Sequence, residues 1–160
     1  TDYVALQRSG DSDLPRVNAS YLKGGFISEI SPALIDTLVA SIAPHPERSN
    51  LVIFQQAGGA IKRVPSDATA FPHRYAEYNM ISTMAWPPTV APQPHIDAIK
   101  KYWAALVPYT HGFYVNEADH ENAAYYNRNY QGNYPRLLAI KRIYDPDNNF
   151  RLNANIRPPA

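Results

Sequence analysis

The sequence predicts an α+β domain in which helices cover one side of a mostly antiparallel β-sheet, followed by a C-terminal helix and an extended tail. Three observations lead to this prediction. Short apolar runs with the alternation of strands are interspersed with amphipathic helical patterns. Glycine and proline turn signals separate the strand patterns, which is typical of hairpins. The chain then closes with a helical pattern bounded by prolines. Hairpin-connected strands mixed with helices favour an antiparallel α+β sheet over a parallel one.

The first strands and the first helix are expected within residues 1–42. Residues 1–23 contain two alternating patches separated by a polar turn, and they predict one or two strands. The Ser31-Pro32 pair predicts a helix start, with Ser31 as the N-cap and the proline in the first turn. The apolar stripe that would face the core consists of Leu34, Ile35, Leu38, Val39 and Ile42.

The sequence predicts three strands in the middle of the chain, within residues 51–86. Residues 51–56 (LVIFQQ) form a short apolar strand, Gly58-Gly59 form a turn, and residues 60–64 form a return strand, so a hairpin is expected over 51–64. Residues 78–86 predict a further strand. Its alternation places Asn79, Ile81, Thr83 and Ala85 on one face and Tyr78, Met80, Ser82 and Met84 on the other.

Helical patterns dominate the second half. Residues 94–107 predict a second amphipathic helix, residues 113–117 (FYVNE) predict a fourth strand, and a short helix is expected near 120–128.

A closing helix and an ordered tail end the chain. Asn133 is the expected N-cap, with Pro135 in the first turn. The Asp145-Pro146 pair ends the helix, because a residue before proline disfavours the αR conformation. The following FRLNANI segment alternates apolar and polar side chains, and we expect it to be extended and docked against the rest of the protein.

Length and composition exclude several classes of protein. A chain of 160 residues can bury the core of one domain. Its net charge of +1 provides no basic field for nucleic acid. No apolar run reaches the length of a transmembrane helix, and no signal-peptide pattern is present. The absence of cysteine excludes disulfides, thiolate zinc sites and a cysteine nucleophile. The sequence does not indicate a compartment.

No local catalytic motif is present. The sequence lacks a phosphate-binding glycine loop, an HExxH pair and a nucleophile elbow. Its five histidines have no metal-ligand spacing, so we expect no metal site. His73 lies between Pro72 and Arg74 just before a strand, and we interpret it as a structural clamp bonding backbone carbonyls in preference to a site residue.

Glu117 is the best single candidate for acid–base chemistry. A covered carboxylate at the end of an apolar strand would have a raised pKa, as a general base near neutral pH requires. A solvated charge beside Asp119 and His120 is the simpler interpretation, and the residues alone favour it. Gln55 and Asn79 are polar groups on apolar strands, which either line a pocket or lie at an edge in water.

The closing stretch resembles the end of a known family. Its pattern N-Y-x-R-L-x-x-I-K-x-x-Y-D-P-x-N-x-F-R-x-N-x-N-I is similar to the closing signature of the berberine-bridge-enzyme-like FAD-linked oxidases. The matching positions are Asn133, Tyr134, Arg136, Leu137, Ile140, Lys141, Asp145, Pro146, Asn148, Phe150, Arg151, Asn153, Asn155 and Ile156. Further matches in the family's order are Tyr21-Leu22-Lys23, Gly58-Gly59, Phe71-Pro72-His73-Arg74, Trp86, Pro108-Tyr109 and Tyr114-Val115-Asn116.

This resemblance implies an organisation and a reaction. Members of the family begin with an FAD-binding domain, so residues 1–160 resemble the substrate-binding domain and C-terminal element, with FAD held mainly by a preceding domain of the same polypeptide. The implied reaction is transfer of hydride from a substrate C–H bond to flavin N5, assisted by a base, with O₂ as the usual final acceptor.

The resemblance also implies site residues. Glu117 occupies the position of the family's base, where members often have tyrosine, and Tyr114 of the same motif is a second catalytic candidate. Gln55, Asn79 and Ile81 match substrate-binding positions. The candidates for contacts with the flavin are Asn116, Asn153 and Asn155, although packing of the tail would explain them equally well. If residues 113–117 form a regular strand, Tyr114 and Asn116 face away from Glu117.

We therefore expect an FAD-linked oxidase of a hydroxyl-bearing small molecule, with carbohydrate as the first candidate. The isolated chain is expected to be inactive. One alternative is an oxidase of an alkaloid- or polyketide-type secondary metabolite, with an apolar pocket around Ile81. Another is a stand-alone binding module that does no chemistry.

Overall fold

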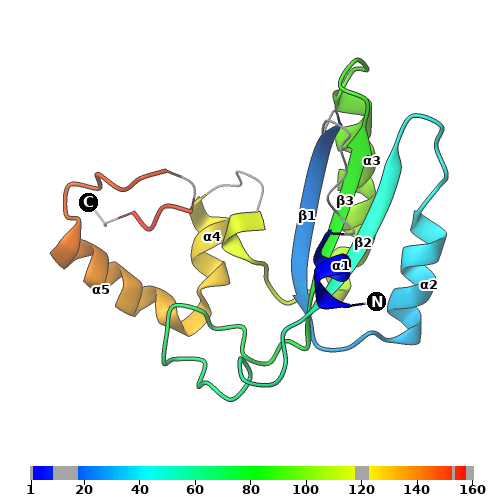
Figure 1. Cartoon of the computed structure of the whole chain (residues 1–160). Coiled ribbons are helices and arrows are strands. Elements are labelled where there is room, and N and C mark those ends of the chain that lie inside the picture. The colour runs from blue at the N-terminus through cyan, green and yellow to red at the C-terminus, as the bar shows by residue number, and fades with distance from the viewer. Residues whose placement is uncertain (1, 9–17, 118–122, 153, 158–160) are drawn as a thin grey trace.

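The computed structural model describes residues 2–8, 18–117, 123–152 and 154–157 (Figure 1). These residues form a three-stranded sheet with helices on one side and a separate helical layer beside its edge. The α+β class with an antiparallel sheet is confirmed.

The sheet has the order β1-β3-β2, and both pairs are antiparallel. Its strands are β1 (Ala19–Ile27), β2 (Ser49–Gln56) and β3 (Tyr78–Trp86). The central strand β3 has most of its residues buried on both faces, whereas the edge strand β2 alternates between exposed and partly buried residues.

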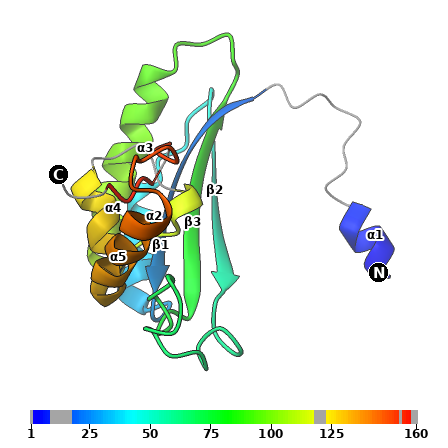
Figure 2. The same ribbon diagram turned by 90° about the vertical axis from the view of Figure 1, so that its left-hand side faces the viewer.

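Two helices cover one face of the sheet, and Figure 2 shows the opposite face open. They are α2 (Pro32–Ser41) and α3 (Gln93–Leu106). Met80, on the covered face of β3, packs with Leu34 of α2 and with Trp103 and Leu106 of α3. Each fully buried aliphatic side chain contributes about 1.5–3 kcal/mol, so this packing accounts for which face is covered.

The remaining helices are shorter or lie outside this core. They are α1 (Tyr3–Arg8), η1 (Val107–Tyr109), η2 (Val115–Glu117), α4 (Ala123–Asn129), η3 (Gln131–Asn133) and α5 (Tyr134–Tyr144). Figure 1 places α4 and α5 beside the β1 edge of the sheet. No helix in the described part of the chain is long and apolar enough to cross a membrane.

Several predicted elements are confirmed. The hydroxyl of Ser31 accepts a hydrogen bond from the Leu34 backbone N–H at 3.2 Å, as an N-cap should. The helix expected over 94–107 is α3. On the register of the sheet, Asn79 lies beside Gln55 and Phe26 on the open face, as the alternation predicts. The short helix near 120–128 is α4, and its expected start lies outside the described residues.

The predicted return strand at residues 60–64 is wrong. These residues form successive turns, with a hydrogen bond from the Val64 N–H to the Ile61 carbonyl. The reason is that β2 pairs directly with β3, and the Ala57 N–H extends this pairing by bonding the Glu77 carbonyl at 2.7 Å. Residues 58–76 are therefore a long connection between hairpin strands.

The expected strands within residues 1–23 are only partly confirmed. The first patch forms α1, which buries none of its side chains, and the second patch begins β1. Six residues of low apolar periodicity do not distinguish a short helix from a strand.

The prediction of a strand at 113–117 is also wrong. Phe113 and Tyr114 are irregular, and Val115–Glu117 form the 3₁₀ helix η2, closed by a hydrogen bond from the Glu117 N–H to the Tyr114 carbonyl at 2.9 Å. The backbone N–H and carbonyl of Phe113 are both bonded by the Asn129 side chain. Phe113 therefore has no backbone group left for a neighbouring strand.

The ends of the closing helix differ from the prediction in one respect. Pro135 lies in its first turn and the helix ends before Asp145, as expected. Asn133 precedes the helix but makes no capping bond, because its backbone is already αR and not extended as at a typical N-cap. Its amide donates to the carbonyls of Ser66 and Thr69 at 2.7 and 2.9 Å. Asn133 instead fastens α5 to the connection between β2 and β3.

The Asp145 carboxylate fixes the start of the tail. It accepts hydrogen bonds from the Asn149 and Phe150 backbone N–H groups at 2.7 and 3.1 Å, and it pairs with Lys141. The bond with Lys141 and the two backbone bonds lower the pKa of Asp145 despite its burial. The Asp145 carboxylate, just after the end of α5, therefore holds the start of the tail against the helix.

Candidate functional site

Three of the predicted site residues meet on the open face of the sheet. The Asn79 amide donates to Glu117 Oε2 at 2.9 Å and to Gln55 Oε1 at 3.2 Å. Asn79 is only 6 % exposed, and its Oδ1 is buried with no hydrogen-bond partner. These residues come from β3, β2 and η2, so the fold assembles a polar cluster (Gln55, Asn79 and Glu117) that no local sequence motif shows.

A glycine makes room for the carboxylate of this cluster. Gly24 lies opposite Ile81 in the β1–β3 pairing, and a Cβ at Gly24 would stand 2.9 Å from Glu117 Oε2. Real Cβ atoms essentially never approach a neighbour below 3.0 Å. Any side chain at this position would push the Glu117 carboxylate out of its present place.

The 3₁₀ geometry of η2 places Tyr114 on the same side as Glu117. Tyr114 lines a cavity of about 340 Å³ together with Gln55 and Asn79. In a regular strand Tyr114 and Glu117 would have faced opposite ways. Asn116 donates to the Tyr114 hydroxyl at 2.8 Å, so its amide holds that ring.

Apolar and aromatic side chains also line this cavity. Phe26, Phe71 and Ile61 line it, and the Phe26 and Phe71 rings are in edge contact with centroids 5.4 Å apart. Ile81 lies next to Asn79 on the open face and is 5 % exposed. A molecule in the cavity would therefore meet both polar groups and aromatic rings.

A buried histidine determines where η2 begins. His73 is 1 % exposed, and its Nε2 lies 2.9 Å from Asn129 Oδ1. The same Oδ1 accepts from the Phe113 N–H at 3.0 Å, and the Asn129 amide donates to the Phe113 carbonyl at 2.9 Å. Because this geometry makes Oδ1 an acceptor, His73 Nε2 carries the proton. The interpretation of His73 as a clamp fits this geometry, with a side-chain amide in place of the expected backbone carbonyls.

The segment next to this clamp (His73, Asn129 and Phe113) is also bonded to the edge strand β1. The Phe26 N–H bonds the Gly112 carbonyl and the His111 N–H bonds the Phe26 carbonyl, each at 2.9 Å. Gly112 has φ +122, and a Cβ there would stand 2.3 Å from the His73 ring. Only glycine accommodates both this backbone conformation and the closeness of the ring.

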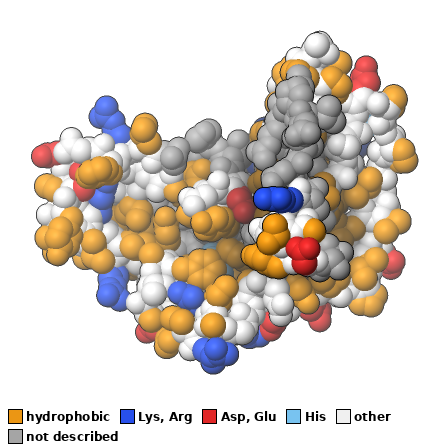
Figure 3. All heavy atoms as spheres, in the orientation of Figure 1, with side chains coloured by type: hydrophobic (Ala, Val, Ile, Leu, Met, Phe, Trp, Pro, Cys, Tyr) orange, Lys and Arg blue, Asp and Glu red, His pale blue; other side chains and the backbone are white. Residues whose placement is uncertain are grey.

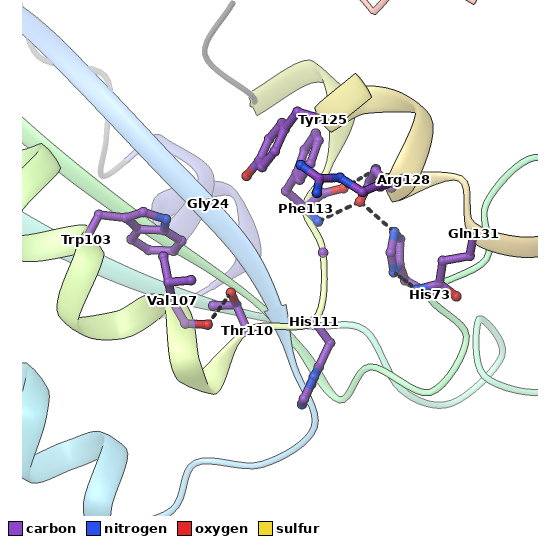
Figure 4. A pocket seen from close by; sticks show the side chains of 12 residues that line it. Gly24, His73, Trp103, Val107, Thr110, His111, Phe113, Tyr125, Arg128 and Gln131 are labelled. Atoms are coloured by element: carbon purple, nitrogen blue, oxygen red, sulfur yellow. Dashed lines mark hydrogen bonds between the residues drawn. The ribbon is translucent and has the colours of Figure 1, made fainter. Parts of the chain in front are cut away.

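A second cavity, of about 320 Å³, lies on the other side of the clamp. Figure 4 shows Trp103 and Val107 on one side of it and Phe113, Tyr125 and His73 on the other. The rings of Phe113 and Tyr125 are stacked with centroids 4.5 Å apart. None of the predicted site residues lines this cavity, and the catalytic and substrate-binding candidates belong to the open face.

The candidates for flavin contacts are more dispersed. Asn116 is exposed and bonds the Tyr114 hydroxyl, and Asn153 lies outside the described residues. Asn155 has a partly buried side chain whose Oδ1 lacks a hydrogen-bond partner. Among the described residues, no group of three or more His, Asp or Glu side chains could hold a metal ion.

Comparison with known proteins identifies the family. The family described as "Berberine and berberine like" matches residues 113–157, from the clamp through the closing helix and tail. An FAD-linked oxidoreductase of Dictyostelium discoideum is 29% identical over 163 residues, which cover 98% of this chain and 34% of that protein. The FAD-linked oxidoreductase YgaK of Bacillus subtilis is 33% identical over 137 residues, covering 84% of this chain and 30% of YgaK. The chain belongs to the berberine-bridge-enzyme-like family.

Solved structures show the same fold. A carbohydrate oxidase from Microdochium nivale superposes with a TM-score of 0.79 at 19% identity, over 98% of this chain and 37% of that one. A glycopeptide hexose oxidase complexed with teicoplanin superposes with a TM-score of 0.78 at 24% identity, over 88% of this chain and 32% of that one. The chain therefore spans about a third of the length of these relatives and solved structures.

Some residues that build this site were not predicted from the sequence. Gly24 belongs to a Gly-Gly pair inside a strand, and such a pair often marks a close approach of another group. Asn129 has no local signal, because its role depends on His73 and Phe113, which lie 56 and 16 residues away in sequence.

The buried His73 predicts a dependence of stability on pH. Burial lowers the pKa of His73 below its ordinary value of 6.5, and the bonds with Asn129 oppose this only in part. The unfolded chain therefore binds a proton near pH 6.5 that the folded chain rejects, and the free energy of unfolding should fall as pH drops from 7 through 6.5. Urea denaturation at several pH values measures this.

A matched pair of variants assigns the effect. His73→Gln should flatten the pH dependence between pH 7 and 5, whereas His111→Gln, at an exposed position, should keep it. Equal slopes in the two variants would show that His73 is not responsible.

Proposed function

We propose that this chain is the substrate-binding part of an FAD-linked oxidase that oxidises a hydroxyl-bearing small molecule, with carbohydrate as the first candidate. The observation that carries the proposal is the polar cluster on the open face of the sheet. A carboxylate held by a buried amide, next to a cavity of about 340 Å³, is an arrangement that can take a proton from a bound hydroxyl.

Glu117 is the base in this proposal. Its Oε2 is held by the Asn79 amide, so the carboxylate has a fixed position, and it accepts the proton of the substrate hydroxyl as the C–H bond is oxidised. FAD supplies the hydride acceptor when it is bound. The protein's contribution is to hold the hydroxyl and the carboxylate in a constant geometry.

Asn79 and Gln55 orient the substrate. Asn79 Oδ1 is a buried acceptor without a partner, and an unmade bond of this kind costs about 1–3 kcal/mol. A second substrate hydroxyl would satisfy it. Tyr114 borders the same cavity, where its ring can pack against the substrate and its hydroxyl is already positioned by Asn116.

The residues present also fit a flavin. Asn155 Oδ1 is a second buried acceptor without a partner, and an amide can bond the donors and acceptors of an isoalloxazine ring. Asn116 bonds the hydroxyl of Tyr114, which lines the cavity, and in this proposal Asn116, Asn153 and Asn155 contact the flavin.

The partner that holds FAD is, in this proposal, another domain of the same polypeptide. Figure 3 shows hydrophobic side chains gathered over α5 and the C-terminal segment. Ile143 and Tyr144 of α5 are 72 % and 80 % exposed, and Phe150 and Leu152 of the tail are each 83 % exposed. Contiguous exposed apolar side chains of this size are typical of a surface that another domain covers.

The aromatic lining of the cavity favours a second substrate class. Phe26, Phe71 and Tyr114 would accommodate the rings of a polyketide- or alkaloid-type secondary metabolite that also bears a hydroxyl. Reduction of the flavin by a panel of sugars and of phenolic alcohols, measured on the longer oxidase, distinguishes the two classes.

Glu117→Gln tests the assignment of the base. The substitution keeps the shape of the side chain but removes its capacity to take a proton, so turnover of the longer oxidase should fall about a hundredfold or more. Steady-state oxidation measured by O₂ consumption checks this. Glu29→Gln, at an exposed position just after β1, should leave turnover unchanged. Near-normal turnover of Glu117→Gln would show that Glu117 is not the base and would favour its interpretation as a solvated charge.

The isolated chain tests the assignment of the cofactor. Purified alone, the 160-residue chain should show no flavin absorbance and negligible affinity for added FAD, because the proposal places most flavin contacts in another domain. Absorption spectra and FAD titration measure this. A flavin band in the purified chain would contradict the proposal, and a longer polypeptide that also lacks flavin would favour a binding module without chemistry.

A further inference from the structure

A third cavity lies on the helix-covered side of the sheet, between α2 and α3. It has a volume of about 420 Å³, within the range of small-molecule sites. Four alanines form much of its wall: Ala40, Ala43, Ala98 and Ala105. Their small side chains leave open a space that larger residues would fill.

The charged side chains that line this interhelical cavity are both cationic, and its uncharged polar lining consists of Ser41, Asn50 and Tyr102. Arg48 and Lys101 both line it, and no Asp or Glu is among its lining residues. Arg48 forms no ion pair among the described residues, and its Nε is buried without a hydrogen-bond partner. A guanidinium that lacks such partners can form a charge-assisted hydrogen bond with an oxyanion that enters the cavity. A bond of this kind contributes about 1.5–3 kcal/mol of free energy.

The same cavity contains a free acceptor. Asn50 Oδ1 is buried and has no hydrogen-bond partner. Asn50 lies opposite Met84 in the β2–β3 pairing, which places it on the covered face, whereas Gln55 faces the open side. The cavity is therefore separated by the sheet from the polar cluster at Glu117.

We propose that this interhelical cavity binds a small hydroxylated anion. Its carboxylate or phosphate group would bond Arg48 and Lys101, and a neighbouring hydroxyl would donate to Asn50 Oδ1. The two cations account for the charge of the ligand and the orphaned carbonyl oxygen accounts for its hydroxyl. The site does not depend on the proposed oxidase chemistry.

The test uses three probes of one carbon skeleton: glycerate, glycerol 3-phosphate and neutral glycerol. Each is titrated into the ¹⁵N-labelled protein, and amide shifts are followed. We expect at least one of the two anions to shift amides within residues 40–50 and 98–105, and glycerol to shift none. The anion that binds tells whether the site takes a carboxylate, a phosphate or both.

Variants then separate a specific site from diffuse attraction. Arg48→Gln should weaken binding of the anion about tenfold or more, and Lys101→Gln should weaken it measurably. Arg63→Gln removes an exposed cation far from the cavity and should leave the Kd unchanged.

Four results would overturn the proposal. They are absence of shifts with both anions, equal shifts with glycerol, shifts confined to residues around Glu117, and equal weakening by Arg63→Gln. The wild-type mapping decides the question even if Arg48→Gln fails to fold.

Discussion

The arrangement of the candidate site depends on one buried hydrogen-bond network, in which His73 holds Asn129 and Asn129 holds the backbone of Phe113. The network takes Phe113 out of any sheet, turns the chain into η2, and so brings Glu117 back over Gly24 to the amide of Asn79. Each of its members is buried, and removing one would leave the others unsatisfied in a medium where that is costly. The clamp therefore joins three parts of the chain: the connection before β3, the segment after η1, and α4.

The two faces of the sheet differ: one is covered by helices, and the other carries the polar cluster of the candidate site. One face is covered by α2 and α3, which pack around Met80 in a buried hydrophobic cluster. The opposite face presents Gln55, Asn79 and Glu117 beside a cavity with aromatic lining. The exposed apolar side chains of α5 and the tail belong to the helical layer beside the β1 edge. The chain spans about a third of the length of its FAD-linked oxidoreductase relatives.

The parts of the fold that sequence reasoning predicted are those decided by local patterns. The Ser31 cap, the stripe of α3 and the alternation of β3 each follow from the geometry of a single element. The errors at residues 60–64 and 113–117 have the opposite cause. Whether an apolar run becomes a strand depends on a partner strand. Residues 60–64 lack one because β2 pairs directly with β3, and residues 113–117 lack one because the Asn129 side chain bonds the backbone of Phe113.

The candidate site shows the same division. The resemblance to the family singled out Gln55, Asn79 and Glu117, and the fold brings them within hydrogen-bonding distance, although the expected strand would have turned Tyr114 away from Glu117. Asn133 was expected to cap a helix, but its side-chain amide donates hydrogen bonds to the Ser66 and Thr69 carbonyls, which are distant in sequence. Polar side chains of this kind choose partners across the fold, and their choice is settled only after the chain is packed.

The central claim is that the His73–Asn129 clamp positions Glu117, and a crystal structure of the Asn129→Ala variant tests it most directly. The account predicts that β1 and β3 keep their register while Phe113 is released and the Glu117 carboxylate leaves Asn79. A structure in which Glu117 Oε2 still lies 2.9 Å from the Asn79 amide, as it does in the intact chain, would contradict it.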